Sequence, residues 1–351
     1  MFEIKPTKAY KKTNSELFSE NGTTPVVTNS SVNNGVTGYS ELSATEKGNI
    51  ITYSDTTTSE GIFYQPYDFV GYPHIQGLYP KLYKEKWNYK TLIYIVVLFK
   101  KVASGRFNYG NKFNRAIARE FMIQLPIKNG EIDFEFMESL VADLEVQHIT
   151  ELDAYLSTTG LKDYELTEEE KESLLNYDNL VWDSYNLSEL FGKATSGKRL
   201  KSADRVKGDL PFVTAGETAE GISDFIGNNV QVFSKNTITI DMFGSAKYRN
   251  YDYGGDDHIA VVHTEKLPMK AAIFVTTAIH KSSHNGQFNY GKNFYAKDAD
   301  ELHIMLPQEN NKPNYKYMQT LISAIQKLVI KDVVLYSDTN LQATKQIINN
   351  N

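Results

Sequence analysis

The chain has 351 residues, of which 23% are charged and 12% aromatic, with a formal net charge of -6 and no cysteine. This composition is typical of globular domains and excludes an intrinsically disordered chain, disulfide bonds and thiolate metal sites. The longest apolar run, around residues 92–99, is far shorter than the ~20 residues of a membrane span, and the N-terminus shows no secretory signal pattern. We therefore expect a cytoplasmic protein that does not contact a membrane.

The acidic charge is concentrated in one part of the chain. Residues 1–126 carry 15 Lys and Arg against 10 Asp and Glu, and residues 191–312 carry 15 against 14. Residues 127–190 carry 3 against 17. Local sign matters more than the total for a polyanionic partner, so the net charge does not exclude nucleic acid binding. An acidic solvated helix between two ordinary domains would give the same pattern, and charge alone does not separate these readings.

The first 126 residues are predicted to consist mainly of strands and turns. Residues 25–28 and 49–53 are short β-branched runs bounded by Asn, Gly and Ser. Residues 91–102 form a continuous apolar run that periodicity cannot assign to a strand or a helix. The matching run at 270–279 carries alanines, which favours a helix for both. Residues 118–125 are predicted as a strand that a proline closes.

Helical spacing begins near residue 133. Apolar residues between 137 and 156 recur at helical spacing with acids between them, which predicts an amphipathic helix of about six turns ending near Gly160. Residues 167–170 read Thr-Glu-Glu-Glu, a capping box that predicts a short helix through residue 175. Residues 318–329 repeat the helical pattern, and the last dozen residues are polar and expected to fray.

The second half of the chain repeats the first. The motif Phe-Asn-Tyr-Gly at 107–110 returns at 288–291, 181 positions later. Further matches lie at offsets of 181 to 187, as loop insertions between shared strands would produce: Leu125-Pro126 with Leu306-Pro307, Phe136-Met137 with Tyr317-Met318, 25–28 with 211–214, Gly35 with Gly221, and 49–53 with 236–240. A fixed period of this kind indicates a tandem duplication.

The duplication predicts an α+β architecture with four segments. Residues 1–130 and 185–312 would form two β-rich domains, residues 131–184 a helical connector, and residues 313–351 a second long helix with a polar tail. Because the two long helices follow equivalent domains, we expect each to cover the apolar stripe of the other as an antiparallel coiled coil.

Catalytic and metal-binding motifs are not evident. The chain has no phosphate-binding loop, no GxGxxG after a strand and no Gly-x-Ser-x-Gly elbow. His280 and His284 have the i,i+4 spacing of a metal-binding helix face, but without a supporting Cys or Glu motif a surface helix explains them as well. Asp241 with Lys247 imitates part of a nuclease site without an evident second acid. We therefore predict no catalytic residues, metal or cofactor.

Basic and polar residues occur in similar places in the two halves. Lys198, Arg199, Lys201, Arg205 and Lys207 open the second half, as Lys5, Lys8, Lys11 and Lys12 open the first. Each one alone is more simply a solvated surface charge, but a duplicated pattern of Lys and Arg with Tyr, Asn, Ser and Thr suits phosphate positioning and base readout.

The order of these motifs, given twice, resembles the specificity (S) subunits of bacterial restriction–modification enzymes. The similarity covers nearly the whole chain and is better in the second half, through Lys198-Arg199, residues 210–214, Glu220-Gly221-Ile222 and Leu306-Pro307. The first half begins almost at Met1 and lacks a Gly-Lys-Arg opening. The compact length and short connector look closer to type IIB-like systems than to type I subunits.

The resemblance implies two target-recognition domains, each reading half of a bipartite site in double-stranded DNA, with the helices as a spacer. It further implies a partner, either a DNA adenine methyltransferase or fused restriction–methylation subunits, which carries the catalysis. The predicted DNA-contact residues are Lys198, Arg199, Lys201, Thr214, Lys247, Arg249, Asn289, Tyr290 and Lys292 in the second half, and Thr28, Ser30, Tyr53, Arg106, Asn108, Tyr109, Lys112 and Arg115 in the first.

Two other classes of function remain open from the sequence. A tandem β-rich carbohydrate-binding or adhesion protein would suit the 23 tyrosines and the Asn- and Thr-rich turns. A stand-alone nuclease is the third hypothesis. Phosphate contacts weaken steeply with salt whereas sugar stacking does not, so salt dependence separates the first two.

Overall fold

The computed structural model describes residues 1–56, 59–107 and 112–349. The chain divides into two compact units: unit 1 comprises Met1–Leu152 with Asn340–Asn351, and unit 2 comprises Asp153–Thr339. The division falls inside a continuous helix, α4 (Phe134–Thr158). None of the helices in the described ranges combines the length and apolarity that crossing a bilayer requires.

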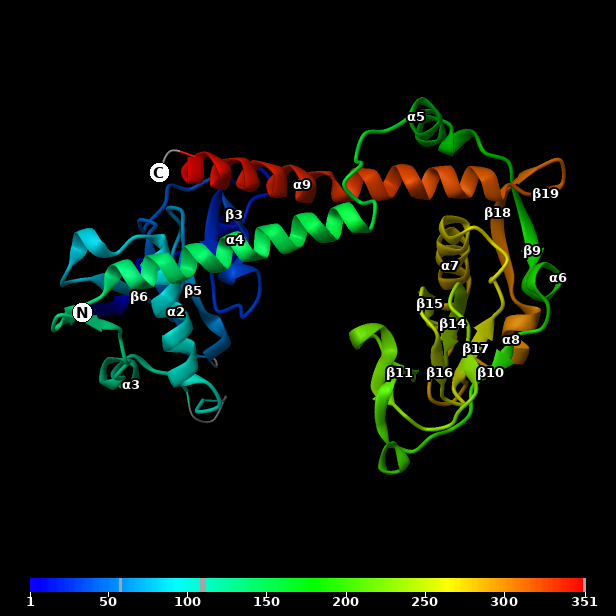
Figure 1. Ribbon diagram of the computed structural model, residues 1–351, viewed down its shortest axis with the longest axis horizontal. Helices are drawn as coiled ribbons and strands as arrows, with labels where there is room; N and C mark the ends of the chain where they lie inside the picture. Colours follow the sequence, from blue (N-terminus) through cyan, green and yellow to red (C-terminus); the bar gives the residue numbers. More distant parts are fainter. Residues whose placement is uncertain (57–58, 108–111, 350–351) are drawn as a thin grey trace. The chain divides into compact units, whose positions relative to one another are not determined.

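The main sheet of unit 1 is antiparallel and has the strand order β1-β6-β4-β5. The 15-residue helix α2 lies against this sheet and shares one apolar core with it (Figure 1). A smaller core under the pair β2–β3 covers part of the other face. The strands are β1 (Phe2–Pro6), β2 (Thr24–Val27), β3 (Val36–Ser40), β4 (Ile50–Ser54), β5 (Ile62–Gln65), β6 (Ile75–Pro80), β7 (Ile127–Lys128) and β8 (Glu131–Ile132), and the α-helices are α1 (Asn14–Leu17), α2 (Tyr89–Ala103) and α3 (Arg115–Glu120).

Unit 2 contains three sheets. Its main sheet, β10-β17-β14-β15, is again antiparallel and is covered by the 15-residue helix α7. The second sheet is β12-β11-β16-β13 and the third is β19-β18-β9. The strands are β9 (Trp182–Asn186), β10 (Thr195–Ser196), β11 (Lys207–Val213), β12 (Ile222–Ile226), β13 (Val232–Phe233), β14 (Thr237–Asp241), β15 (Ala246–Arg249), β16 (Tyr253–Gly255), β17 (Ile259–Val262), β18 (His303–Glu309) and β19 (Lys312–Pro313), and the α-helices are α5 (Glu168–Leu175), α6 (Leu187–Phe191), α7 (Met269–Ser283), α8 (Ala296–Glu301) and α9 (Tyr315–Asn349).

The two main sheets are copies of one another. Their strand orders correspond one to one, and α2 and α7 have the same length and the same place after the last sheet strand. The predicted duplication is therefore confirmed at the level of topology, as is the helical assignment of 91–102 and 270–279. Short helical turns repeat as well, at Asn33–Gly35 and Thr218–Gly221, and further turns lie at Ser59–Gly61, Lys84–Lys86, Tyr177–Asn179 and Ser202–Asp204.

The predicted strand at 118–125 is wrong. Residues up to Glu120 belong to α3, and residues 121–126 are in neither a helix nor a ladder among the described residues. The equivalent residues of unit 2 do form a strand, β18, because β9 pairs with them. A strand requires a partner, and the local sequence of 118–125 does not contain that information.

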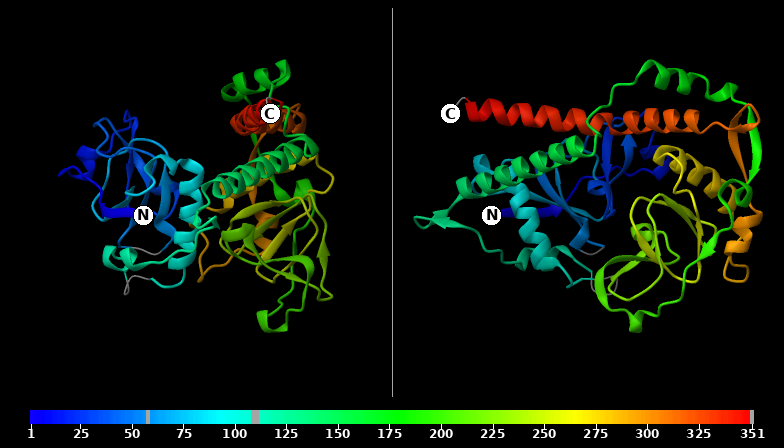
Figure 2. Two further views of the ribbon diagram at one scale, coloured as in Figure 1. Left: turned by 60° about the vertical axis from the view of Figure 1, so that its left-hand side comes forward. Right: turned by 45° about the vertical axis from the view of Figure 1, so that its right-hand side comes forward.

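Helices α5 and α9 lie side by side within unit 2 (Figures 1 and 2). Thr167 caps α5 as its sequence predicts, with the Glu170 side chain returning to the Thr167 backbone N–H. Lys327 of α9 forms ion pairs with Asp163 at 2.9 Å and with Glu170 at 3.2 Å. The hydrogen bond that Lys327 donates to Asp163 raises the pKa of Lys327, which therefore stays charged. Lys327 thus joins α5 and the turn before it to α9.

Candidate nucleic-acid interface

Several loops converge at one end of the main sheet in unit 2. The ladders place Ser196, Ala260, Ile240 and Ala246 in one row across the four strands. The residues immediately beyond that row begin or end loops, and neighbouring strands are ~4.8 Å apart. The loops at 197–201, 241–245 and 256–258 therefore open at the same end of the sheet, although they are distant in sequence. This end of the sheet with its loops is called the loop edge below.

The basic loop after β10 approaches the backbone of the second sheet closely. The N–H of Lys198 donates to the Gly255 carbonyl at 2.9 Å, and a Cβ on Gly197 would lie 2.1 Å from that oxygen. Glycine is therefore required at 197 for the loop to pass. Lys198 and Lys201 are exposed, whereas Arg199 lies 3.6 Å from the carboxylate of Asp257. The loop is thus fixed by its backbone and presents its cations to solvent.

Thr214 occupies a turn that both units share. Its N–H donates to the carbonyl of Gly221 at 2.9 Å, and in unit 1 the N–H of Thr28 donates to Gly35 at 2.8 Å. Both glycines have φ near +80°, which favours glycine. A Cβ on Gly221 would also lie 2.7 Å from the Thr214 carbonyl. The predicted pair Thr28 and Thr214 therefore lies at equivalent, partly exposed positions.

Lys247 lies beside the turn between β14 and β15. Its ammonium is 3.3 Å from Glu217, 2.9 Å from the Ser245 hydroxyl and 4.0 Å from Asp241. The hydrogen bond from Ser245, helped by Lys247, lowers the pKa of Glu217. Asp241 is buried and accepts the N–H groups of Phe243 and Ser245, so it holds the turn. Lys247 therefore forms its main ion pair with Glu217, a partner that the sequence did not predict.

The second Phe-Asn-Tyr-Gly motif forms a tight turn. Asn289 and Lys292 exchange two backbone hydrogen bonds of 3.0 Å, and the Asn289 side chain accepts the N–H of Gly291. Tyr290 stands at the tip with 86% of its surface exposed, its ring edge-on to Phe243 at 5.2 Å. This aromatic contact brings the turn next to the β14–β15 turn. Asn289 and Lys292 are exposed beside it.

Two predicted contact residues lie in the interior. Tyr53 is 1% exposed and belongs to the core of unit 1, where burial raises the pKa of its hydroxyl. Arg249 is also 1% exposed, and its guanidinium donates to the hydroxyls of Thr239 and Tyr251. Neither side chain can reach a ligand at the surface, so both are structural. Arg205 is similarly folded against the Phe212 ring, 5.0 Å away.

The predicted residues of unit 1 are more dispersed. The hydroxyl of Ser30 donates to the carbonyl of Val32 in the loop after β2. Arg106 is exposed and lies 5.0 Å from the Phe121 ring, Lys112 is exposed, and Arg115 is half-buried at the start of α3. Asn108 and Tyr109 lie outside the described residues.

Lys8 of unit 1 has the place that the basic loop has in unit 2. Lys8 follows the first strand of the main sheet, β1. A Cβ added to Gly71 would lie 2.6 Å from the carbonyl oxygen of Lys8. The neighbouring residue Ala9 bridges Gly71, the counterpart of Gly255. Sequence reasoning identified Lys8 and Lys11 as opening this position but did not include them among the contact residues. Aligning the two repeats would have been enough to include Lys8 and Lys11 among the predicted contact residues.

The model of the type I restriction modification DNA specificity domain matches residues 1–154 and matches again at residues 179–335. The chain belongs to this family. It is a DNA specificity subunit of a restriction–modification system, and the carbohydrate-binding alternative finds no support. The repeated match also corresponds to the repeated topology of units 1 and 2.

Known proteins that are similar to this specificity subunit include the following two. One is the specificity subunit S.BcgI of a type II restriction enzyme of Heyndrickxia coagulans, 24% identical over 320 residues, which cover 89% of this chain and 88% of that protein. The other is the crystal structure of the S subunit of a type I restriction–modification system from M. genitalium, with a TM-score of 0.61 and 16% identity over 99% of this chain and 92% of that one. The second likeness supports the fold.

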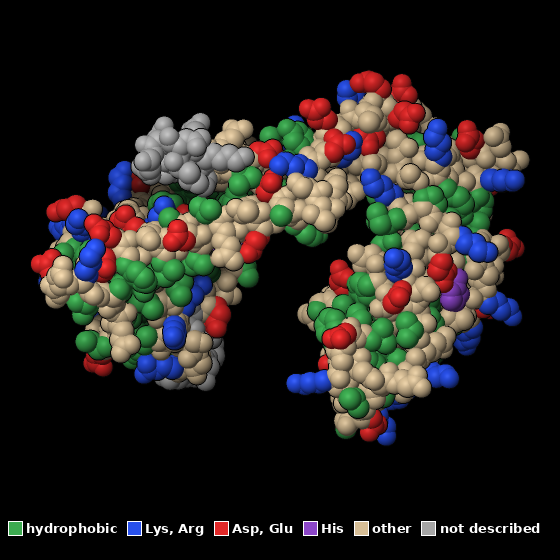
Figure 3. Space-filling model, in the orientation of Figure 1, with side chains coloured by type: hydrophobic (Ala, Val, Ile, Leu, Met, Phe, Trp, Pro, Cys, Tyr) green, Lys and Arg blue, Asp and Glu red, His purple; other side chains and the backbone are tan. Residues whose placement is uncertain are grey.

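The candidate interface of this specificity subunit is mixed in charge. Lys and Arg side chains are scattered singly among acids on the face of unit 2 that Figure 3 shows. At the loop edge, Arg199 and Lys247 have acidic partners, while Lys198 and Lys201 are in no ion pair among the described residues.

Metal ligation is not needed to explain the histidines and acids near this edge. The N–H of Ala246 donates to Nδ1 of His280, and the rings of His280 and His284 are 4.7 Å apart. Asp256, Asp257 and His258 come within ligand distance of one another, but Asp256 accepts the N–H of Leu200 and Asp257 faces Arg199. These contacts hold the loops together.

Proposed function

We propose that the chain reads the two halves of a bipartite DNA sequence, one with each unit, and has no catalytic site of its own. The observation that carries this proposal is the double family match over two units of the same topology. The loops of unit 2 open at one end of its main sheet, and the main sheet of unit 1 has the same strand order, so one molecule would offer two similar reading surfaces. DNA as the target is also the reason to expect the protein in the cytoplasm.

Within this proposal the exposed cations position the backbone and the loop tips read bases. Lys198, Arg199 and Lys201 suit phosphate oxygens. Tyr290 and Asn289, at the tip of a rigid turn, suit base contacts in a groove. Thr214, Lys247 and Lys292 flank these residues in unit 2, and the corresponding set in unit 1 is Thr28, Ser30, Arg106, Lys112 and Arg115, with Asn108 and Tyr109 retained from the sequence.

The two long helices act as the spacer between half-sites. We propose that α4 and α9 pack as an antiparallel coiled coil, with the domains divided at 1–130, 131–184, 185–312 and 313–351. Support comes from unit 2, where Lys162 pairs with Asp153 at the end of α4 and with Asp338 of α9, the latter at 3.3 Å. A rigid spacer would fix the number of base pairs between the half-sites.

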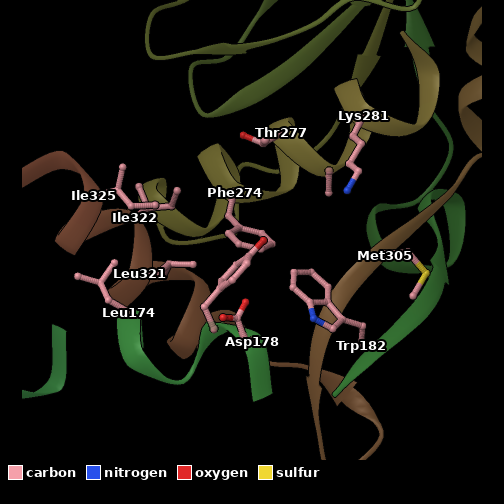
Figure 4. Close-up of a pocket in the computed structure, with 12 residues that line it drawn as sticks. Leu174, Asp178, Trp182, Phe274, Thr277, Lys281, Met305, Leu321, Ile322 and Ile325 are labelled. Carbon is pink, nitrogen blue, oxygen red and sulfur yellow. The ribbon is translucent and has the colours of Figure 1, made fainter. Parts of the chain in front are cut away.

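The catalytic partner is an adenine methyltransferase or a fused restriction–methylation subunit, and apolar surfaces on the helices suit its docking. In unit 2, a groove of about 620 Å³ runs between α7, α9 and the third sheet, with Trp182, Phe274 and Ile325 in its wall (Figure 4). In unit 1, apolar side chains gather over α2 and α4 (Figure 3). Val97 of α2 and Leu144 of α4 are among the exposed apolar residues of these helices. The likeness to a type II enzyme subunit favours a type IIB-like system.

Selection from random duplexes tests the proposal. The purified chain, alone and with its co-purified partner, is incubated with a pool of random double-stranded DNA, and the bound fraction is sequenced. We expect one motif with two defined halves and a fixed gap, and methyl transfer only when the partner is present. An absence of sequence preference in both samples would refute the function, and methylation or metal-dependent cleavage by the chain alone would refute the non-catalytic role.

A further inference from the structure

The turn that begins at Thr28 in unit 1 and at Thr214 in unit 2 has the same unusual backbone in both units. Residues 28–35 correspond to residues 214–221 without an insertion. Three successive residues of each copy are left-handed: Asn33, Asn34 and Gly35 with φ of 49°, 54° and 79°, and Ala219, Glu220 and Gly221 with φ of 47°, 55° and 78°. Alanine and glutamate rarely adopt this conformation, because it is unfavourable for a residue with a Cβ. A strained backbone that is repeated this closely indicates a shape that both units need.

In unit 1 a buried side chain of the main sheet holds the turn. Gln65, the last residue of β5, is 3% exposed. Its side-chain amide donates to the carbonyl of Asn34 at 3.1 Å and to the hydroxyl of Thr52 at 2.9 Å. The side chain of Asn34 donates in return to the carbonyl of Tyr64 at 2.9 Å. This left-handed residue is therefore bonded to the sheet through both its main chain and its side chain.

In unit 2 an arginine has the same place. Arg249 is the last residue of β15, and the β14–β15 ladder has the same register as the β4–β5 ladder. Arg249 donates to the hydroxyl of Thr239 at 2.9 Å, and one of its terminal nitrogens lies 3.9 Å from the Cβ position of Gly221. It also donates to the hydroxyl of Tyr251, which donates to the carboxylate of Glu220 at 3.4 Å. The buried arginine therefore supports the turn from the interior, as the glutamine does in unit 1.

Both turns lie at the same end of their main sheets. In unit 2, the N–H of Asp256 at the loop edge donates at 2.9 Å to the carbonyl of Val213, directly before the turn. In unit 1, the side chain of Asn29 accepts a hydrogen bond of 2.9 Å from the hydroxyl of Ser54, the residue that ends β4. Because β4 corresponds to β14, whose last residue also begins a loop at the loop edge, the two turns occupy equivalent places.

The two turns present different side chains on this common backbone. The four residues before the left-handed run, called the tip residues, are Asn-Ser-Ser-Val at 29–32 and Ala-Gly-Glu-Thr at 215–218. The last two tip residues are exposed in each copy. Side chains that differ on a shared frame are what two units need in order to read two different sequences.

Glu217 is a tip residue of unit 2 with 65% of its side chain exposed. The Ser245 hydroxyl, together with the ammonium group of Lys247, lowers the pKa of its carboxyl group, which therefore stays ionised. An ionised carboxylate only accepts hydrogen bonds. In the major groove guanine, adenine and thymine each present an acceptor that would repel it, whereas cytosine presents only the donor of its N4 amino group. The chemistry of this side chain therefore suits cytosine.

We propose that the turns at 28–35 and 214–221 are the elements through which the two units read bases, and that Glu217 accepts a hydrogen bond from the N4 amino group of a cytosine. The strained backbone fixes the direction of the exposed tip residues, and the buried Gln65 and Arg249 are positioning residues for that backbone. This inference rests on the proposed function, because it takes DNA as the target.

Exchange of the tip residues tests the inference on the full-length protein. A Cβ on Gly216 would meet no atom within 4 Å, so the turn of unit 2 has room for the side chains of unit 1. The variant combines four substitutions: Ala215→Asn, Gly216→Ser, Glu217→Ser and Thr218→Val. Motifs are selected from random duplexes for the wild type and the variant, each with its co-purified partner. We expect one half of the bipartite motif to change while the other half and the gap stay the same. An unchanged motif, or a change in both halves, would overturn the inference.

A single substitution tests the base that Glu217 reads. Glu217→Gln keeps the size of the side chain, and at an exposed position it is expected to leave folding unchanged. Because glutamine pairs with the N6 and N7 atoms of adenine, we expect the preference for cytosine at one position of the same half to fall about tenfold or more, in favour of adenine. The matched control is Glu301→Gln, which removes an exposed acid from the end of α8 and should leave every position unchanged. A change in affinity for all duplexes without a change in base preference would show that Glu217 acts only through its charge, and would overturn its assignment.

The wild-type selection separates failure of this inference from failure of the proposed function. If the wild type selects no motif, the proposed function is wrong and the inference falls with it. If the wild type selects a bipartite motif that neither the tip exchange nor Glu217→Gln alters, the function stands and the turns are not the reading elements.

Discussion

The basic loop after β10 offers the sharpest test of DNA contact. We consider the double substitution of Lys198→Gln and Lys201→Gln, which removes two exposed charges without disturbing the loop backbone. Each phosphate contact contributes about 0.9 to the slope of log affinity against log salt. If both lysines contact phosphates, the slope falls by about 1.8, and raising salt from about 50 to about 200 mM costs the variant about 12-fold less affinity than the wild type.

Fluorescence anisotropy on the selected duplex at four or more salt concentrations measures this slope. The matched control is Lys316→Gln with Lys331→Gln, two exposed lysines of α9 that remove the same charge away from the loop edge. We expect the control slope to equal that of the wild type. An unchanged slope in the loop variant would refute phosphate contact, and an equal fall in the control would show that only net charge matters.

Three further predictions concern unit 2. Because Tyr290 is 86% exposed, Tyr290→Ala should change the free energy of unfolding by less than about 0.5 kcal/mol while weakening DNA binding by about 1–3 kcal/mol in anisotropy, and only for duplexes with an intact unit 2 half-site. Gly197→Ala should destabilise unit 2 by about 2 kcal/mol or more in thermal denaturation, since its Cβ would lie 2.1 Å from the Gly255 carbonyl, whereas Gly216→Ala, with open space around its Cβ, should not. Burial lowers the pKa of His280, so the folded state disfavours its protonation, and the free energy of unfolding should fall as pH drops below about 6.5. The variant His280→Asn keeps a hydrogen-bond acceptor and should reduce this pH dependence, measured as the melting temperature.

One outcome of the Gly216 control and one outcome of the pH series would each contradict these predictions. Equal destabilisation by both alanine variants would show that the close approach at Gly197 is not what fixes the loop. A melting temperature that falls equally with pH in wild type and His280→Asn would assign the acid sensitivity to other groups.

Local sequence determined the repeat, the helices and the caps. The Thr167 capping box predicted α5 to the residue, and the alanines of the second copy correctly assigned α2 and α7 as helices. These features depend on neighbours within about four positions, for which side-chain spacing and propensity suffice. The duplicated motifs needed only self-comparison. The resemblance of these motifs to restriction–modification specificity subunits agreed with the family to which the chain belongs.

Tertiary structure alone decided which residues are accessible and which strands are paired. All five residues of β4 are buried because separate cores cover its two faces. Alternation of polar and apolar residues along the strand therefore could not predict that Tyr53 is buried. Arg249 is buried by hydroxyls from β14 and from the loop after β15. Residues 121–126 lack a ladder because no β9 equivalent is paired there in the described chain. Loop convergence likewise follows from strand register, which joins residues that are far apart in sequence.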